Sequence, residues 1–212
     1  ELALMRGEHH KVARAYVLYH EQRAKQRYKT AKLNEQVGAK VSTMAVTKRD
    51  GNKEDISLEK ITNRISVLSN GLEIDPITIA QKAIQGLYDG ITTNEIDTYL
   101  AETAAALTVE HPDYSYLAGR IKANALHKET PGFVIATKNL FEDGLLREEY
   151  HQKVMANAEE IEKIIDYDRD YLFDYFALTT LFRAYLLQFN NKVIERPQDL
   201  WMRVALCVSG DK

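Results

Sequence analysis

Apolar residues recur at intervals of three and four along most of the chain, which is the spacing of amphipathic helices. Between residues 58 and 129 four such stripes follow one another, and each is only one helix face wide. Helices of that kind must pack against others to bury their apolar face, so the pattern predicts a small helical bundle. The four stripes are Leu58/Ile61/Ile65/Leu68, Ile77/Ala80/Ile84/Leu87, Ile96/Leu100/Thr103/Leu107 and Tyr114/Leu117/Ile121/Ala125.

Start and stop signals separate these helices. Gly71 ends the first, Asp75-Pro76 opens the second, Thr92 and Glu95 form a capping box for the third, and Pro112 opens the fourth. Ahead of them, Met44–Arg49 has a strand-like pattern, Asp50-Gly51 is a turn signal, and a return strand over Glu54–Ser57 completes a hairpin. The predicted fold is mainly α: a four-helix bundle with a small β-hairpin cap, followed by a mostly helical region.

The flanking segments have weaker patterns. Val12, Ala15, Tyr16 and Tyr19 predict a helix within residues 1–30, and its basic end is best explained as a solvated helix terminus. Residues 31–43, with Gly38, are predicted to be a linker. After Pro131 we expect helices over Phe133–Asp143 and Glu148–Ile164, a hairpin turning at Asn190-Asn191, and a last helix from Pro197 through Trp201 and Val204.

Composition limits the classes of function. The chain is 45% hydrophobic and 28% charged with a net charge of −3, which favours a soluble globular protein and gives no sign of nucleic-acid binding. No apolar run is as long as a membrane span. The lone Cys207 allows neither an internal disulfide nor a cysteine metal site, and we expect it to be a small core residue of a cytoplasmic protein. The chain starts without Met and stops after an apolar run, so we expect a piece of a larger protein.

The candidate chemistry is phosphate binding. Lys48, Arg49, Lys60 and Lys128 are the cations that a polyphosphate site would need. Thr93 and Asp97 share a helix face that we place outside the Ile96/Leu100 stripe, where they could contact a ribose, a base edge or a metal-bound phosphate. From spacing alone, each of these residues is more often a surface charge or a cap. The sequence has no glycine-rich phosphate loop and no nucleophile with an activating partner, so we predict no catalytic residue and no protein metal site.

Several motifs, taken in order, resemble a known family. Val46–Gly51 followed by Glu54 and Lys60-Ile61, then Gln85–Asp97, then His111–Tyr114 and Leu126–Thr130, are similar to the ATP-cone. Tyr167–Asp170 and Glu195–Gln198 resemble the start of the catalytic region of class I ribonucleotide reductase large subunits. From the residues alone, Tyr167–Asp170 would be a salt-bridged helix entrance. Ala3–Gly7 and Val12–Tyr19 look like the last helix of a preceding cone in reductases that carry cones in tandem.

The resemblance implies an organisation and a function. It divides the chain into the tail helix of a preceding cone (1–30), a linker (31–43), an ATP-cone (44–130) and the truncated N-terminal part of the catalytic domain (131–212). It implies that ATP and dATP, with Mg²⁺, act as allosteric effectors of an enzyme that reduces ribonucleoside diphosphates to deoxyribonucleotides. The partners implied are a small, radical-generating subunit and other large subunits, with no nucleic acid and no membrane. The nucleotide contacts carried over are Lys48, Arg49, Glu54, Ser57, Lys60, Thr93, Asp97 and Lys128.

The same resemblance implies that this piece is not itself catalytic, because the redox cysteines of the family have no counterpart in it. Two alternatives stay open, and a third is excluded within this piece. The cone could have lost nucleotide binding and serve as a structural or oligomerisation spacer, or the chain could be a helical interaction module without a ligand. A transcriptional repressor with a cone as its sensor would need a zinc ribbon with paired cysteines, which one cysteine does not provide.

Overall fold

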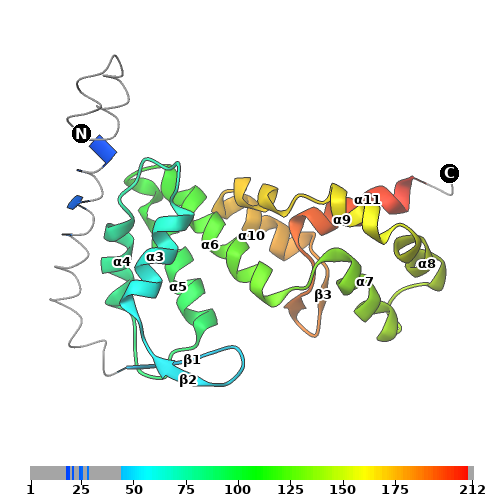
Figure 1. Cartoon of the computed structure of the whole chain (residues 1–212), viewed down its shortest axis with the longest axis horizontal. Helices are drawn as coiled ribbons and strands as arrows, with labels where there is room; N and C mark the ends of the chain where they lie inside the picture. The colour runs from blue at the N-terminus through cyan, green and yellow to red at the C-terminus, as the bar shows by residue number, and fades with distance from the viewer. Residues whose placement is uncertain (1–17, 20, 22–23, 26–27, 29–43, 210–212) are drawn as a thin grey trace, which may run out of the picture. The chain divides into compact units, whose positions relative to one another are not determined.

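The computed structural model describes residues 44–209, together with Leu18, Tyr19, Glu21, Ala24, Lys25 and Tyr28 (Figure 1). The tail helix predicted within 1–30 and the linker predicted at 31–43 therefore lie, apart from those six residues, outside the described part of the chain. Two compact units contain the described residues. The first holds the residues up to Asn70 and Asp75–Thr93, and the second holds Gly71–Ile74 and the residues from Asn94 onward.

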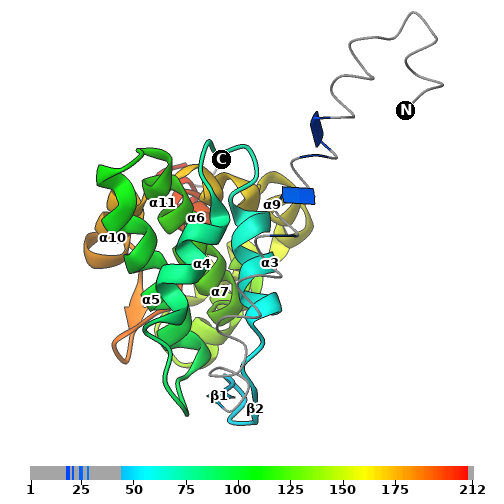
Figure 2. The same cartoon turned by 90° about the vertical axis from the view of Figure 1, so that its left-hand side faces the viewer.

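The first unit begins with a hairpin of β1 (Ala45–Thr47) and antiparallel β2 (Lys53–Asp55), which leads into the start of α3 (Leu58–Leu68) (Figure 2). The predicted return strand over Glu54–Ser57 is wrong in its bounds. Ser57 instead caps α3, because its side chain accepts a hydrogen bond from the backbone N–H of Lys60. Helix α4 (Pro76–Ile84) packs against α3.

The local signals around α4 work as predicted. Asp75 is its N-cap and accepts a hydrogen bond from the backbone N–H of Ile77, with Pro76 in the first turn. All members of the predicted stripe Ile77/Ala80/Ile84/Leu87 are buried, although the helix itself ends at Ile84. In α3 the buried residues are Leu58, Thr62 and Ile65. Thr62 can be buried because its hydroxyl donates to the carbonyl of Leu58.

The third and fourth predicted helices are α5 (Thr93–Ala106), continued by the 3₁₀ helix η1 (Leu107–Val109), and α6 (Asp113–Glu129). The predicted fold class, mainly α with four helices after a small hairpin, is confirmed. One detail of α5 is wrong. Asp97 is only 3% exposed and belongs to the buried face with Ile96 and Leu100, whereas we placed it outside that stripe.

The rest of the second unit is helical apart from one hairpin. After α7 (Phe133–Glu142), the single helix predicted over Glu148–Ile164 is two helices, α8 (Glu148–Ala156) and α9 (Ala158–Ile164), which meet at Asn157. Asn157 has φ −115° and ψ 17°, outside helical values, and its side-chain amide donates to the carbonyl of Lys153. The remaining elements are η2 (Tyr167–Leu172), α10 (Tyr175–Ala184), β3 (Gln188–Phe189), β4 (Lys192–Val193) and α11 (Pro197–Val208).

The turn between β3 and β4 has positive φ angles at Asn190 (49°) and Asn191 (60°), which fits a two-residue type I′ hairpin. Helix α11 opens at Pro197 as predicted. Its C-terminal half is largely exposed, and Cys207 lies on the surface, so the prediction that this thiol is a core residue is wrong. Trp201 on the same helix is 51% exposed.

Two apolar clusters hold the second unit together. The first joins α6, α10, the hairpin and α11 through Ala123, Leu126, Leu178, Leu181, Leu186 and Leu200. The second joins α7, α8 and α9 through Phe133, Val154 and Ile161. Helix α6 also approaches the turn before α10 closely at Gly119, where a β-carbon would lie 2.3 Å from the carbonyl oxygen of Phe173. The backbones of the two segments therefore touch at a point that requires glycine.

Candidate nucleotide-binding site

The cations of the first motif stand at the turn of the β1–β2 hairpin. The backbone N–H of Lys48 donates to the carbonyl of Asn52 at 2.8 Å, and Gly51 donates back to Lys48 at 3.0 Å. Gly51 has φ +83°, which glycine adopts without strain. The carboxylate of Asp50 accepts from both the backbone and the side chain of Asn52, and these bonds lower its pKa. Strand β1 therefore ends before Lys48. It has to end there if Lys48 and Arg49 are to bind the same ligand.

Glu54 on β2 draws two of the predicted cations together. Its carboxylate lies 2.6 Å from Nζ of Lys48 and 3.2 Å from Nζ of Lys60, one on each oxygen. The hydrogen bond from Lys48 and then that from Lys60 lower the pKa of Glu54, and the same bond to Glu54 raises the pKa of Lys48. All three groups remain open to water, so this Lys48–Glu54–Lys60 triad orients its ammonium groups more than it stabilises the fold.

A segment before α5 runs beside β1 and brings the start of that helix to the hairpin. Gly90 donates to the carbonyl of Ala45 at 2.8 Å, the N–H of Thr47 donates to the carbonyl of Ile91 at 2.9 Å, and Thr47 and Thr92 form a parallel bridge. The backbone N–H of Ala45 donates to the side chain of Asp89 at 2.7 Å. Because the two segments are parallel, the residues that follow the bridge, Lys48 and Thr93, continue from the same edge.

Thr93 is the first residue of α5, and its hydroxyl is buried without a hydrogen-bond partner among the described residues. Such a group costs free energy unless something satisfies it. The hydroxyl also stands at a helix N-terminus, where backbone N–H groups and the helix dipole favour anions. An acceptor such as a phosphate or ribose oxygen would satisfy the Thr93 hydroxyl and the backbone N–H groups of this helix N-terminus.

The structure brings Lys48, Glu54, Ser57 and Lys60 together, with Arg49 next in the chain and exposed. Ser57 is engaged as the cap of α3. Asp97 and Lys128 belong to the second unit, on α5 and α6. Asp97 is buried, whereas Lys128 is exposed near the end of its helix. Their assignment to a nucleotide stays a prediction.

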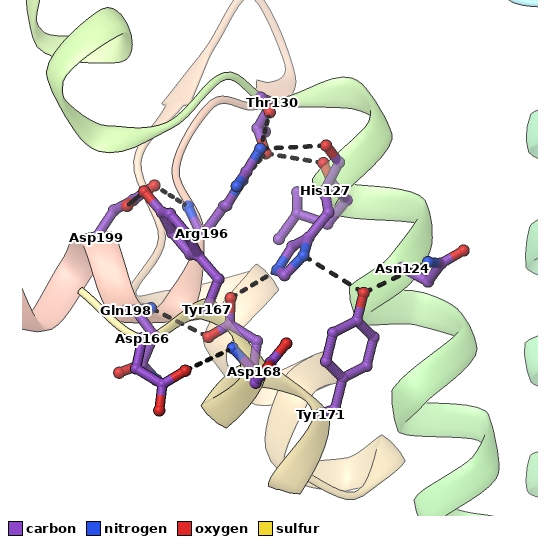
Figure 3. Close-up of polar contacts among 12 residues, drawn as sticks. Asn124, His127, Thr130, Asp166, Tyr167, Asp168, Tyr171, Arg196, Gln198 and Asp199 are labelled. Atoms are coloured by element: carbon purple, nitrogen blue, oxygen red, sulfur yellow. Dashed lines mark hydrogen bonds and ion pairs between the residues drawn. The ribbon is translucent and has the colours of Figure 1, made fainter. Parts of the chain in front are cut away.

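The structure also brings together a second set of polar residues. The sequence did not predict that they form a cluster. Figure 3 shows side chains from the end of α6, from η2 and from the start of α11 that point toward one another. Asp170 is fully buried, with its carboxylate 2.7 Å from Nε2 of His127, and Arg196 donates to oxygens of Thr130. The sequence analysis had named the segments Leu126–Thr130, Tyr167–Asp170 and Glu195–Gln198 separately, and nothing in their spacing shows that they meet.

The salt-bridged entrance proposed for Tyr167–Asp170 is right in one part and wrong in another. Arg169 does pair with Asp166, at 3.4 Å on the surface, and Asp166 caps η2. Asp170, however, points inward to His127 and is not part of that surface pair.

A hollow between α7, α8 and α11 is too small for a nucleotide. Its cavity volume is about 20 Å³, enough for one water. Its wall includes Tyr150, whose hydroxyl is buried without a partner among the described residues and whose pKa burial raises to about 12. A nucleotide site at the hairpin and the start of α5 stays a prediction.

Comparison with known proteins gives matches over most of the chain. Residues 44–129 match the ATP cone domain, and residues 171–212 match the ribonucleotide reductase all-alpha domain. The ribonucleoside-diphosphate reductase large subunit of Dictyostelium discoideum is 42% identical over 188 residues, and that of Caenorhabditis elegans is 44% identical over 179 residues. The chain therefore contains an ATP cone domain and, after it, part of a ribonucleotide reductase all-alpha domain.

These matches cover 81% and 78% of this chain, but the chain spans only 22% and 23% of the two reductase relatives. The ribonucleoside-diphosphate reductase large subunit of Arabidopsis thaliana is 42% identical over 181 residues, again 22% of its length. The hairpin, α3 to α6 and the unpartnered Thr93 hydroxyl all fall within the ATP cone match. None of the helices described here is both long and apolar enough to cross a membrane.

Proposed function

We propose that this chain is the allosteric ATP- and dATP-binding region of a ribonucleoside-diphosphate reductase large subunit. The observation that carries the proposal is the parallel bridge between Thr47 and Thr92. It sets the triad Lys48–Glu54–Lys60 and the N-terminus of α5 at one edge of the first unit, so cations and a helix dipole can act on one polyphosphate.

In this proposal Lys48, Arg49 and Lys60 bind phosphate oxygens, with Lys128 as a fourth cation. Glu54 draws the two lysines together and exchanges them to the phosphates on binding. Thr93 donates its unsatisfied hydroxyl to the ligand, Ser57 fixes the start of α3, and Asp97 contacts the ribose or a metal-bound phosphate. The nucleotide arrives with Mg²⁺, which screens part of the phosphate charge.

The wider assignment follows from the family. The whole enzyme would reduce ribonucleoside diphosphates to deoxyribonucleotides in the cytoplasm, together with a small radical-generating subunit and further large subunits. This chain would carry no catalytic residue of that reaction. ATP or dATP at the cone would shift the equilibrium between active and inhibited assemblies, and such a shift requires unequal affinity for the two states, typically about 1–3 kcal/mol.

Calorimetric titration of the 212-residue chain with ATP and with dATP, each with and without Mg²⁺, tests the proposal. Lys48→Ala should weaken binding about tenfold or more, because a charge-assisted hydrogen bond is worth about 1.5–3 kcal/mol. Lys53→Ala is the matched control, since Lys53 is exposed on the same hairpin opposite Thr47 and lies outside the triad. Equal affinities for the two variants would remove Lys48 from the site.

The alternative is a cone that acts as a spacer. It draws support from the triad, because Glu54 already neutralises part of the charge of Lys48 and Lys60 without any ligand. No heat with either nucleotide, in a chain whose circular dichroism confirms its helices, would favour the spacer.

A further inference from the structure

The inner side of α11 is engaged along its whole length. Leu200 is buried in the first apolar cluster, and Met202 and Leu206 pack against the second. The carbonyl of Leu206 also accepts a hydrogen bond from Nζ of Lys153 on α8, at 3.2 Å. Contacts at both ends of the helix therefore fix which side of α11 faces the core of the second unit.

The two charged side chains of α11 are held on the inner side as well. Asp199 is 1% exposed and accepts a hydrogen bond from the hydroxyl of Tyr167 at 2.7 Å. Nε of Arg203 lies 2.6 Å from the carboxylate of Glu195, which is 4% exposed. Turning the helix about its axis would leave both buried carboxylates without these partners, which is costly. The outer side of α11 therefore stays outside.

That outer side carries four exposed apolar residues, Trp201, Val204, Ala205 and Val208. Their spacing of i, i+3, i+4 and i+7 places them on one face of the helix. Trp201 is 51% exposed, Val204 43% and Val208 80%. We call these four residues the outer stripe. Single exposed apolar residues are common, but a helix that is apolar on both sides is typical of the interior of a larger protein.

A second copy of the chain is a poor fit to the outer stripe. A specific, stable interface buries about 800 Å² per partner, from about 20–30 residues a side. The stripe has four residues, which span about 11 Å along the helix at a rise of about 1.5 Å per residue. A segment of the same polypeptide needs less contact area, because its tether raises its effective concentration at the helix.

The reductase relatives are long enough to contain such a segment. The match to the all-alpha domain, residues 171–212, includes the whole of α11, and the chain spans 22% of the Dictyostelium relative. We propose that the outer stripe is the docking surface for an apolar segment of the polypeptide that follows Lys212 in the complete large subunit. This rests on the proposed function only in taking the chain as part of such a subunit, and it requires no bound nucleotide.

Hydroxyl-radical footprinting, resolved to single residues by mass spectrometry, compares the 212-residue chain with the complete large subunit. The oxidation rate of Trp201 should fall about fivefold in the complete subunit, because its exposed fraction drops from 51% to that of a residue in an interface core. In the 212-residue chain the rate should not depend on protein concentration. An equal rate in the two proteins would overturn the docking surface. A rate that falls as the short chain is concentrated would replace it with a contact between two copies.

Val204→Lys tests the outer stripe through stability. In the 212-residue chain the melting temperature should stay the same or rise slightly, because lysine suits an exposed position near a helix C-terminus. In the complete subunit the melting temperature should fall, because the substitution places a charge in a buried contact. Val109→Lys is the matched control, since Val109 is 96% exposed on η1, and it should leave both proteins unchanged. Equal tolerance of Val204→Lys in the two proteins would contradict the proposal.

Calorimetry with ATP on the same samples separates this proposal from the proposed function. Nucleotide binding together with an unprotected Trp201 would overturn the docking surface alone. A protected Trp201 in a complete subunit that binds no nucleotide would overturn nucleotide binding and leave the docking surface intact. If Val204→Lys prevents folding of the complete subunit but not of the short chain, the stripe is needed for the larger fold, as proposed. If the short variant also fails to fold, Ala205→Lys on the same stripe takes its place.

Discussion

Gly119 gives a test in which two physical effects oppose each other. It lies inside α6, where replacing glycine by alanine normally stabilises a helix by about 1 kcal/mol. Here the added β-carbon would lie 2.3 Å from the carbonyl oxygen of Phe173 and 2.8 Å from the carbonyl carbon of Asp174. Both neighbours are backbone atoms, so no side chain can turn aside to make room.

The size of the effect follows from that distance. Real β-carbons essentially never lie closer than 3.0 Å to such atoms, so the turn before α10 must retreat by at least 0.7 Å. The retreat pulls on Leu178 and Leu181, which are buried against α6 in the first apolar cluster. Overpacking of a well-packed core costs about 1–3 kcal/mol. We place this case at the upper end and expect Gly119→Ala to destabilise the chain by about 2 kcal/mol net of the propensity gain.

Urea unfolding followed by circular dichroism measures the loss in unfolding free energy. In thermal melts, the melting temperature should fall by about 4–8 °C for a chain of this size. Thr98→Ala, at an exposed position of α5, is the control, because it gains helix propensity without a new contact. A Gly119→Ala variant as stable as the original chain, or more stable, would refute the close approach of α6 to the Phe173–Asp174 backbone.

Three further outcomes are expected. Burial raises the pKa of Asp199 from 3.8 to about 6, so the folded state holds its proton more tightly. The free energy of unfolding should therefore fall by up to about 3 kcal/mol as pH rises from about 4 to 6. Urea titrations should show a smaller fall in Asp199→Asn. Asn191→Ala should cost about 1 kcal/mol in thermal melts because φ is +60°, whereas Asn191→Gly should not. In the complete reductase, Asp97→Asn should blunt dATP inhibition and leave basal turnover nearly intact. Normal dATP inhibition in this variant would contradict the prediction. Lost turnover would mean that Asp97, which is 3% exposed, supports the fold instead.

Local sequence signals predicted the elements whose chemistry is local. Asp75-Pro76 marks the start of α4 and Asn190-Asn191 the second hairpin because capping and turn geometry depend on a few neighbouring residues. The break at Asn157 was not predicted, since Val154 and Ile161 continue one apolar stripe across it and both are buried. Helix α10 was missed as well.

Burial that depends on distant partners was predicted less well. Cys207 follows an apolar run, yet only part of α11 faces the core. Asp97 looked like a surface residue because acids usually are, and its burial depends on tertiary packing. The pairing of His127 with Asp170 joins residues 43 positions apart, which no local pattern encodes. Lys48 and Lys60 were named from the sequence as candidate cations, whereas the role of Glu54 as their shared partner needed the hairpin register.

The exposed Trp201 has a practical consequence for spectroscopy. It is the one tryptophan in the sequence, and it lies on α11, five residues after Arg196. Its indole is half open to solvent, so its emission wavelength and its quenching by acrylamide respond to changes around that helix. Excitation at the red edge of the tryptophan band therefore makes the unlabelled chain its own optical reporter of α11, in real time and at micromolar concentration.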